Sequence, residues 1–242
     1  MFNKCLRFVS HKEVVISILV LLPGMDGTGE LFAEFLSHVD GDYLVIPLPD
    51  HGPQDHASLA QVIHKQLPQQ DYILLAESFS GGIIPELLKL GPIHIKGVIF
   101  VASFLSSPNK YLLPIAKRLP IKALASSPIS IIFHKLLFLG RGASKALVSN
   151  FVKVIKSIPD EILKNRLEVM SKQVLPQVTF ELPTLYIQAL SDKLISANKS
   201  QEVSKIFNHI EFKTIAGPHF VLQTKPKECA LVVNQFIQSG SS

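Results

Sequence analysis

The sequence predicts an α/β protein with a doubly wound, mostly parallel sheet, helices on both of its faces, and an inserted helical cap. Short apolar runs alternate along the chain with helix-like segments, as buried parallel strands joined by helices do. The alternation stops between Phe104 and Val178, where helix-like pieces punctuated by prolines replace it. A chain of 242 residues, 47% of them hydrophobic, can bury a large core in one domain.

Six apolar runs are the expected strands of the sheet, and helices are expected between most of them. The strands are 14–22, 43–47, 72–77, 95–102, 184–189 and 211–215. The helices are 30–39, 59–67, 81–90, 199–207 and 226–237, the fourth of them capped by Asn198 or Ser196. In sheets of this kind the catalytic groups lie at the carboxyl ends of the strands, so reactive side chains are expected in the loops that follow these runs.

The amino-terminal segment superficially resembles a secretory signal, because basic residues precede the apolar run 14–22. These residues are Lys4, Arg7 and Lys12. However, Glu13 interrupts the basic part, no small-residue cleavage motif follows, and the run is too short to span a membrane. We therefore expect 14–22 to be a buried strand and the protein to be cytoplasmic.

The helical stretch is expected to form a cap inserted after the strand 95–102. Residues 1–103 and 179–242 then form the core, and residues 104–178 form the cap. The helix-like pieces of the cap are 111–118, 129–139, 145–157 and 160–174. The cap holds 12 Lys and Arg against 3 acidic residues and so carries +9, whereas the whole chain carries +5 and the remainder therefore −4.

Ser78 lies where an apolar run ends and a helix-like segment begins. Small residues, Ala76 and Ser80, stand two positions before and after it, with Gly81 and Gly82 close behind. This pattern is typical of a nucleophile elbow, in which a serine occupies a strained strand-to-helix turn and its neighbours must be small. Glycine usually fills the two flanking positions, and similar patterns occur in ordinary turns, so other parts of the chain must supply the rest of the site.

Asp192 and His219 each follow a later predicted strand. A serine hydroxyl needs a base to remove its proton, and that base needs a third group to hold its tautomer. Three strand ends carry Ser78, Asp192 and His219 in the chain order of such triads. A loop aspartate is more often a turn residue, and most of the other eight histidines are expected to be solvated. His219 differs because Gly217 and Pro218 precede it directly after an apolar run.

The oxyanion that forms on an attacked carbonyl needs hydrogen-bond donors. One expected donor is the backbone N–H of Phe79, directly after the serine. The second is the N–H of Met25 in the glycine-rich loop 23–29, which follows the first strand. Glycine-rich loops also cradle phosphates, but this one lacks both a Gly-Lys-Ser/Thr sequence and full GxGxxG spacing. Asp26 is expected to shape the turn rather than to act in catalysis.

These motifs together resemble the α/β-hydrolase superfamily over nearly the whole chain. They are Pro-Gly-Met-Asp-Gly-Thr-Gly at 23–29, Ala-Glu-Ser-Phe-Ser-Gly at 76–81 and Gly-Pro-His-Phe at 217–220. Within the superfamily, the chain resembles small bacterial carboxylesterases that include pimeloyl-acyl-carrier-protein methyl ester esterases of biotin synthesis. The resemblance implies the α/β-hydrolase fold and ester hydrolysis. Ala76 and Ser80 depart from the usual glycines, but both are small and keep the expected mechanism.

The sequence therefore predicts a serine carboxylesterase that works through an acyl-enzyme. Ser78 attacks the ester carbonyl, His219 takes and returns the proton, and Asp192 orients the imidazole. No metal or organic cofactor is expected, and Cys5 and Cys229 are expected to be ordinary thiols in a reducing compartment. Two alternatives stay open: an acyltransferase that uses the same acyl-enzyme, and a ligand-binding protein that retains the fold, against which the complete triad argues.

The basic cap indicates the kind of substrate. A basic patch at an active-site entrance attracts an anionic partner and speeds its encounter, and acyl carrier proteins are acidic. An acidic acyl carrier protein is therefore an expected partner, although lysines that only solvate apolar helices produce the same composition. Nucleic acid is not expected, because aromatic and basic residues do not interleave in a binding motif. Contact between the cap and a membrane surface is less favoured.

The cap also supplies the candidates for an acyl pocket. It is rich in leucine, isoleucine and phenylalanine, most of which are expected to pack against the sheet domain. Phe133, Phe138 and Phe151 are the candidate substrate-binding residues among them.

Overall fold

The computed structural model describes residues 17–108 and 138–239. At its centre is one sheet of six parallel strands in the order β2-β1-β3-β4-β5-β6. The strands are β1 (Ile18–Leu22), β2 (Tyr43–Val45), β3 (Tyr72–Glu77), β4 (Ile95–Val101), β5 (Thr184–Ala189) and β6 (Ile210–Ile215). From β1 the chain first runs to the edge strand β2 and then returns to build the other side through β3. The predicted doubly wound sheet is therefore confirmed.

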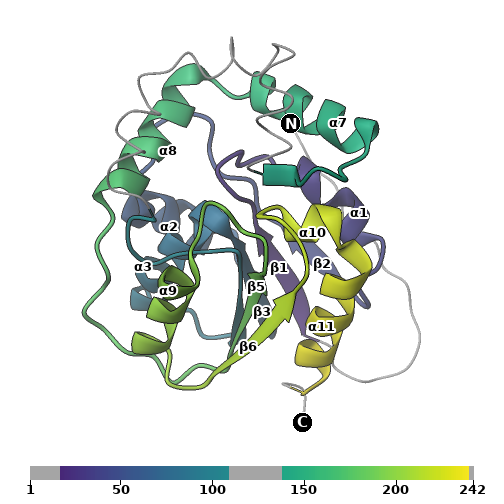
Figure 1. The fold of residues 1–242 in the computed structure, drawn as a ribbon. Coiled ribbons are helices and arrows are strands. Elements are labelled where there is room, and N and C mark those ends of the chain that lie inside the picture. The colour runs from purple at the N-terminus through teal and green to yellow at the C-terminus, as the bar shows by residue number, and fades with distance from the viewer. Residues whose placement is uncertain (1–16, 109–137, 240–242) are drawn as a thin grey trace.

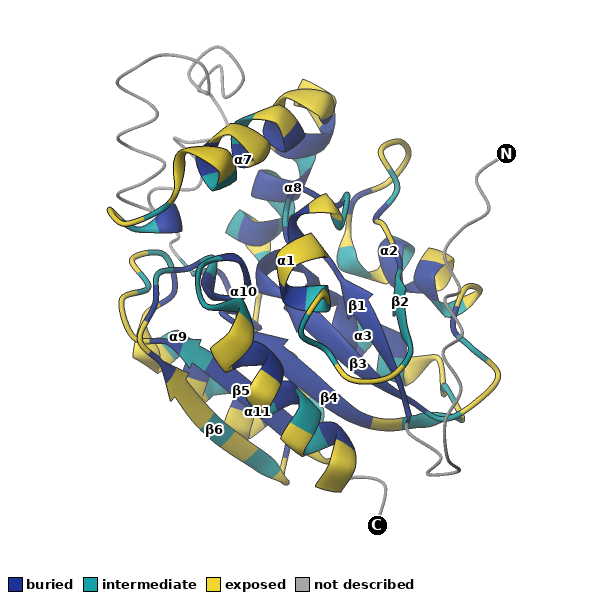
Figure 2. Ribbon diagram, turned by 90° about the vertical axis from the view of Figure 1, so that its right-hand side faces the viewer, coloured by how far each residue is buried: buried dark blue, intermediate teal, exposed yellow. Residues whose placement is uncertain are grey.

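Helices cover both faces of the sheet (Figure 1). One face carries α2 (His56–His64), α3 (Ile83–Lys89) and α9 (Ala197–Gln201), and the other carries α1 (Ala33–Leu36) and α11 (Pro226–Ser239). The central strands β1, β3 and β4 are almost wholly buried between these layers (Figure 2). Burial on both faces explains why these strands read as continuous apolar runs rather than as alternating patterns.

The predicted strand bounds agree closely with the structure. β3 and β5 have the predicted limits, and β4 and β6 each differ from them by one residue. β2 ends at Val45 instead of Pro47, because proline has no N–H with which to continue the ladder. β1 begins at Ile18, and residues 14–16 of that predicted strand lie outside the described residues.

The helices depart further from the predictions. The predicted helix 30–39 is a short 3-10 turn, η1 (Glu30–Phe32), followed by α1. α2 begins three residues earlier than predicted, because the Asp55 side chain accepts a hydrogen bond from the Ser58 N–H (2.9 Å) and caps it. The predicted helix 199–207 is α9 followed by η4 (Glu202–Lys205), with Ser196 at the cap position but without a side-chain bond. The four-residue α10 (Val221–Thr224) was not predicted, since one turn is too short to show a period.

Two helices of the predicted cap lie above the carboxyl ends of the strands (Figure 1). They are α7 (Lys145–Ser157), which has the predicted bounds, and α8 (Asp160–Lys172), which is two residues shorter than predicted. A separate hydrophobic cluster joins them to Leu31 of η1 through Val148, Phe151 and Leu163. The predicted helix 111–118 and most of 129–139 lie outside the described residues, and the division into core and cap stays a prediction.

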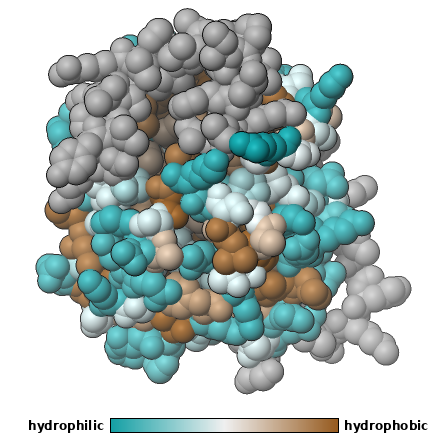
Figure 3. All heavy atoms as spheres, viewed as in Figure 1, coloured by the Kyte–Doolittle hydropathy of each residue, from teal (hydrophilic) through white to brown (hydrophobic). Residues whose placement is uncertain are grey.

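The described surface is mixed in character. On the face shown in Figure 3, hydrophobic residues are interspersed among hydrophilic ones. The exposed large hydrophobic residues come from separate elements: Val62, Leu90, Ile93, Val174, Leu190 and Leu231. No helix in the described ranges is both long enough and apolar enough to cross a membrane.

Candidate active site

The loops that follow β1, β3, β5 and β6 emerge at the same edge of the sheet, because all the strands are parallel. They carry Met25, Ser78, Asp192 and His219, respectively. Residues more than a hundred positions apart in the sequence thus converge at one place. This edge is where doubly wound sheets usually hold their ligands.

Ser78 occupies a strained turn between β3 and the 3-10 helix η2 (Ser78–Gly82). Its φ is 49°, in the left-handed region that side chains other than glycine rarely adopt. Such a conformation costs on the order of 1–3 kcal/mol and persists only where the surrounding structure imposes it. The nearby Gly81 cannot be replaced without rearrangement, since a Cβ there would lie 1.7 Å from Ser103 Oγ. The local backbone is that of a nucleophile elbow.

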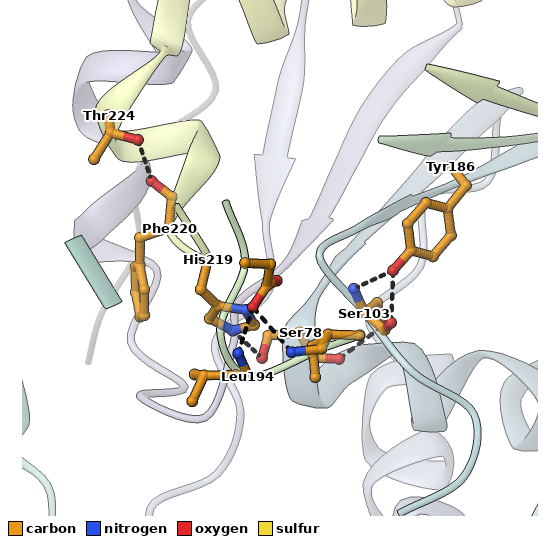
Figure 4. Close-up of polar contacts among 9 residues, drawn as sticks. Ser78, Ser103, Tyr186, Leu194, His219, Phe220 and Thr224 are labelled. Carbon is orange, nitrogen blue, oxygen red and sulfur yellow. Dashed lines mark hydrogen bonds and ion pairs between the residues drawn. The ribbon is translucent and has the colours of Figure 1, made fainter. Parts of the chain in front are cut away.

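Ser78, His219 and Asp192 form one chain of hydrogen bonds (Figure 4). Ser78 Oγ lies 2.9 Å from His219 Nε2, and His219 Nδ1 lies 2.8 Å from Asp192 Oδ2. The His219 and Asp192 side chains are only 5% and 4% exposed. The other oxygen of Asp192 accepts the N–H groups of Leu194 (2.8 Å) and Ile195 (2.9 Å), which fixes the carboxylate. With the Nδ1 proton directed at Asp192, Nε2 is free to accept the serine proton.

Ser103 and Tyr186 hold the elbow from the neighbouring strands (Figure 4). Ser103 Oγ donates to the carbonyl oxygen of Ser78 at 2.7 Å. Tyr186 Oη donates to the Ser103 carbonyl (2.7 Å) and accepts the Ser103 N–H (3.0 Å). Burial raises the pKa of Tyr186 far above its usual value, which keeps the hydroxyl proton available for donation. Ala102, which precedes Ser103, also has a positive φ (44°), so backbone strain gathers on this side of the elbow.

Ser80 explains one departure of the elbow from the usual glycine pattern. Its hydroxyl is buried and donates a short hydrogen bond to the carbonyl oxygen of Pro23, at the start of the loop 23–29. In the same loop, a Cβ on Gly24 would lie 3.6 Å from Ser78 Cβ. The loop that carries Met25 is therefore fastened against the serine. The oxyanion-binding roles of the Met25 and Phe79 N–H groups stay predictions.

Glu77, the residue before the serine, has a buried carboxyl group that sequence reasoning missed. It is 3% exposed, and its Oε1 accepts a hydrogen bond from Gln223 Nε2 at 2.9 Å. Burial raises the pKa of Glu77 to about 7, and the charge of Asp26 adds to the rise, whereas the bond from Gln223 opposes it. Glu77 links the elbow to α10, directly behind His219.

The raised pKa of Glu77 makes stability depend on pH. The folded protein holds the proton of Glu77 more tightly than the unfolded chain does. The contribution of this group to the unfolding free energy is therefore fully present below about pH 4.5 and is lost as the pH rises through about 7. We expect E77Q, which is neutral at every pH, to exceed the wild type in unfolding free energy by up to about 3 kcal/mol at pH 8, with little difference at pH 4.5. Urea unfolding at the two pH values measures this.

The exposed Glu30 supplies the matched control for Glu77. E30Q removes one carboxylate from the surface and is expected to leave the pH dependence of stability unchanged. If the stability curves of E77Q and the wild type run parallel between pH 4.5 and pH 8, Glu77 does not titrate in this range as described.

Two of the three candidate acyl-pocket residues lie beside the loop between β6 and α10, which carries His219. Phe138 and Phe151 pack with Phe220, the residue after His219, at ring-centroid distances of 6.0 and 5.2 Å. The ring of Phe220 in turn lies 5.6 Å from that of His219. Phe133 lies outside the described residues. An aromatic cluster thus borders His219 on the side of α7.

His56 does not behave as the solvated residue that the sequence suggested. Its ring lies 5.0 Å from that of Phe79, and its buried Nε2 has no hydrogen-bond partner among the described residues. Burial lowers the pKa of His56 to about 4, so the ring is neutral at pH 7. A Cβ on Gly82 would lie 2.2 Å from the His56 ring, so this glycine makes room for it. The imidazole packs as part of the wall behind the elbow.

A cavity of about 860 Å³ adjoins the site without containing it. It is lined mainly by parts of η1, α1, α7 and α10, together with Gly217 and Pro218, which precede His219. Ser78, Asp192 and His219 do not line it. Within residues 17–108 and 138–239, no three histidine, cysteine or acidic side chains are grouped so that they could hold a metal ion.

Comparisons with known proteins identify the fold. Neither the models of protein families nor the curated proteins searched match this chain. Solved structures do match. A hydrolase from Pseudomonas aeruginosa PA01 gives a TM-score of 0.76 at 16% identity, covering 91% of this chain and 89% of that one. An esterase from Exiguobacterium antarcticum gives 0.77 at 13% identity, covering 92% of each chain.

A third similar structure is a thermophilic esterase from Thermogutta terrifontis. It gives a TM-score of 0.75 at 12% identity, and the match covers 93% of this chain and 91% of that one. Identities this low show the fold alone. The chain has the α/β-hydrolase fold, as its motifs suggested, and its structural neighbours are hydrolases and esterases.

Proposed function

We propose that the protein is a serine carboxylesterase that hydrolyses an acyl ester through an acyl-enzyme. The observation that carries this proposal is the hydrogen-bonded chain from Asp192 through His219 to Ser78. Its serine stands on a strained elbow at the carboxyl edge of an α/β-hydrolase sheet. A ligand-binding protein without turnover has no evident need for all three groups in this geometry.

The geometry supports a two-step mechanism. Ser78 Oγ attacks the ester carbonyl carbon while His219 Nε2 takes the hydroxyl proton, and Asp192 stabilises the imidazolium that forms. The N–H groups of Met25 and Phe79 stabilise the oxyanion. When the carbon–oxygen bond of the ester breaks, His219 gives its proton to the departing alcohol. A water molecule, deprotonated by His219, then attacks the acyl-enzyme and releases the acid.

Charge on the cap supports a more specific substrate. Six of its basic residues are exposed on or beside α7 and α8: Arg141, Lys145, Lys153, Lys156, Lys164 and Lys172. Lys172 pairs with Glu168 at 2.6 Å. A seventh basic residue, Arg166, is buried and contributes nothing to the surface. We extend the proposal to an acyl ester carried by an acidic acyl carrier protein, such as the pimeloyl-carrier methyl ester of biotin synthesis, in the cytoplasm.

Salt dependence tests the carrier part of the proposal. We expect kcat/KM for pimeloyl-carrier methyl ester to fall by about tenfold between 50 and 500 mM NaCl, because salt screens the attraction between cap and carrier. Hydrolysis of a free methyl ester should change little over the same range. The product should be the free acid even when an alcohol competes, since transfer to the alcohol would indicate an acyltransferase.

A charge-reversed cap sharpens the same test. K153E/K156E changes two exposed residues of α7 and should weaken turnover of the carrier-linked ester while sparing the free ester. If turnover of the carrier-linked ester and of the free ester changed equally with salt or with the double substitution, the carrier protein would not be the partner. The proposed esterase function would remain.

A further inference from the structure

Arg166 is a buried cation in the middle of α8. It is 1% exposed, although arginine is almost never fully buried without a partner. Ile162, Arg166 and Met170 recur at four-residue spacing and all lie on the buried face of this helix. Burial lowers the pKa of Arg166 to about 10, while Asp26 and Asp50 act in the opposite direction, so the group stays charged at neutral pH.

The partners of Arg166 are neutral oxygens rather than a carboxylate. Its Nη1 donates to the carbonyl oxygen of Met25, its Nη2 to that of Pro49, and its Nε to Gln54 Oε1, each at 2.8 Å. Among the described residues, no carboxylate lies within ion-pair distance of it. Burying a guanidinium without a carboxylate partner costs free energy, so we expect Arg166 to have a role beyond stability.

All three acceptors belong to loops at the carboxyl edge of the sheet. Met25 lies in the loop after β1, and Pro49 and Gln54 lie in the loop after β2. Gln54 Nε2 in turn contacts the carbonyl oxygens of Pro49 (3.2 Å) and Gly52 (3.1 Å), which stiffens the second loop. One side chain of the cap therefore ties these two loops together.

The fit around the guanidinium is tight. Gly27 has a φ of 72°, and a Cβ on it would lie 2.3 Å from Arg166 Nη1 and 2.9 Å from Cζ. The second glycine of the loop 23–29 is thus required both by its backbone conformation and by the arginine. The guanidinium also stands 6.0 Å from the ring centroid of Phe79.

We infer that Arg166 is a positioning residue that sets the oxyanion hole from the cap. It holds the carbonyl of Met25 and packs against the ring of Phe79, the two residues whose N–H groups are the proposed oxyanion donors. The Met25 carbonyl lies in the peptide plane that follows Met25, and Arg166 holds this plane directly. The Met25 N–H lies in the preceding plane, whose Gly24 carbonyl accepts the N–H of Gly27 at 3.0 Å. Because Gly27 packs tightly against the guanidinium, Arg166 constrains this second plane through Gly27. The inference rests on the proposed esterase function. It implies that catalysis requires α8 to be packed against the loops after β1 and β2.

The test separates transition-state stabilisation from substrate binding. We expect R166M to lower kcat for a p-nitrophenyl ester on the order of 100-fold while KM changes less than about threefold, because displaced donors act mainly on the transition state. The inhibition constant of a boronic acid, which forms a tetrahedral adduct with the serine, should rise in parallel with the loss in kcat. A purely structural role would not produce this parallel.

Two further variants keep the test decisive. R166K retains the charge and much of the aliphatic stem but loses the planar fork that reaches three acceptors, so we expect an intermediate loss of about tenfold in kcat. If R166M does not fold, the kinetics of R166K alone test the role of Arg166. E161Q, an exposed change on the same helix, should keep wild-type kinetics.

The outcomes distinguish this inference from the proposed function. A folded R166M or R166K with wild-type kcat and unchanged boronic acid inhibition would overturn the role of Arg166 while leaving the esterase intact. Absence of Ser78-dependent hydrolysis in the wild type would instead remove the proposed function itself.

Discussion

Replacing Ser78 with alanine is expected to lower kcat for hydrolysis of a p-nitrophenyl ester by at least about 10⁴-fold. The side chain is the proposed nucleophile, and its Oγ is the only atom of the residue that contacts His219 in the hydrogen-bonded chain. Alanine keeps the small volume that the elbow requires, so folding should survive. Initial rates at saturating substrate measure the effect.

The Ser78 prediction has a simple matched control. Ser204 is an exposed serine of η4 whose hydroxyl donates to the Gln201 carbonyl rather than to a residue of the proposed site, and S204A should keep wild-type rates. Folded S78A with more than about one-hundredth of the wild-type kcat would show that this serine is not the nucleophile.

The second large effect is expected for D192N, with a loss of about 10³- to 10⁴-fold in kcat. Asp192 accepts a hydrogen bond from His219 Nδ1 at 2.8 Å. An asparagine amide in its place can donate to Nδ1 and so favour the tautomer that carries the proton on Nε2. That tautomer cannot accept the proton of Ser78. The loss should fall on kcat rather than on KM, as steady-state kinetics would show.

The backbone contacts of Asp192 make the asparagine variant a fair test. One carboxylate oxygen accepts the N–H groups of Leu194 and Ile195, a role that the amide oxygen of asparagine can keep. The melting temperature of D192N should therefore stay close to that of the wild type. Retention of a tenth or more of wild-type kcat would mean that another group orients His219.

Each of the three residues of the proposed triad has a local signature in the sequence. Ser78 directly follows an apolar run, and Asp192 and His219 lie in the loops after two later runs. Parallel strands bring such positions to one edge whatever their separation in sequence. The strand positions and the α7 helix followed from similar local patterns, whereas the order of the strands in the sheet came only from the structure. Helix ends were less accurate where a single side chain, such as Asp55, decides the boundary.

The supporting residues could not be predicted in the same way. Tyr186 and Glu77 lie inside apolar runs, where nothing marks them as polar partners of Ser103 and Gln223. The contact of Tyr186 depends on β4 and β5 becoming neighbours in the sheet, and that of Glu77 depends on where α10 packs. Arg166 could not be predicted either, since the sequence analysis counted it only among the basic residues of the cap, whereas the structure buries it.

Ser80 shows how a departure from a motif can carry information. The sequence allowed it only because it is small. In the structure its hydroxyl donates to the Pro23 carbonyl and joins the elbow to the loop of the proposed oxyanion donor Met25. A glycine at this position would permit the turn but would lose the link.

The central claim is that Ser78 is an activated nucleophile, and covalent labelling with a fluorophosphonate tests it most directly. Intact mass spectrometry followed by peptide mapping should show one adduct on the wild type, located on Ser78, and none on folded S78A. Labelling should weaken strongly in D192N, because the same base activates the serine toward the probe. A folded wild-type protein that takes up no probe, or an adduct on another serine, would contradict the proposed esterase.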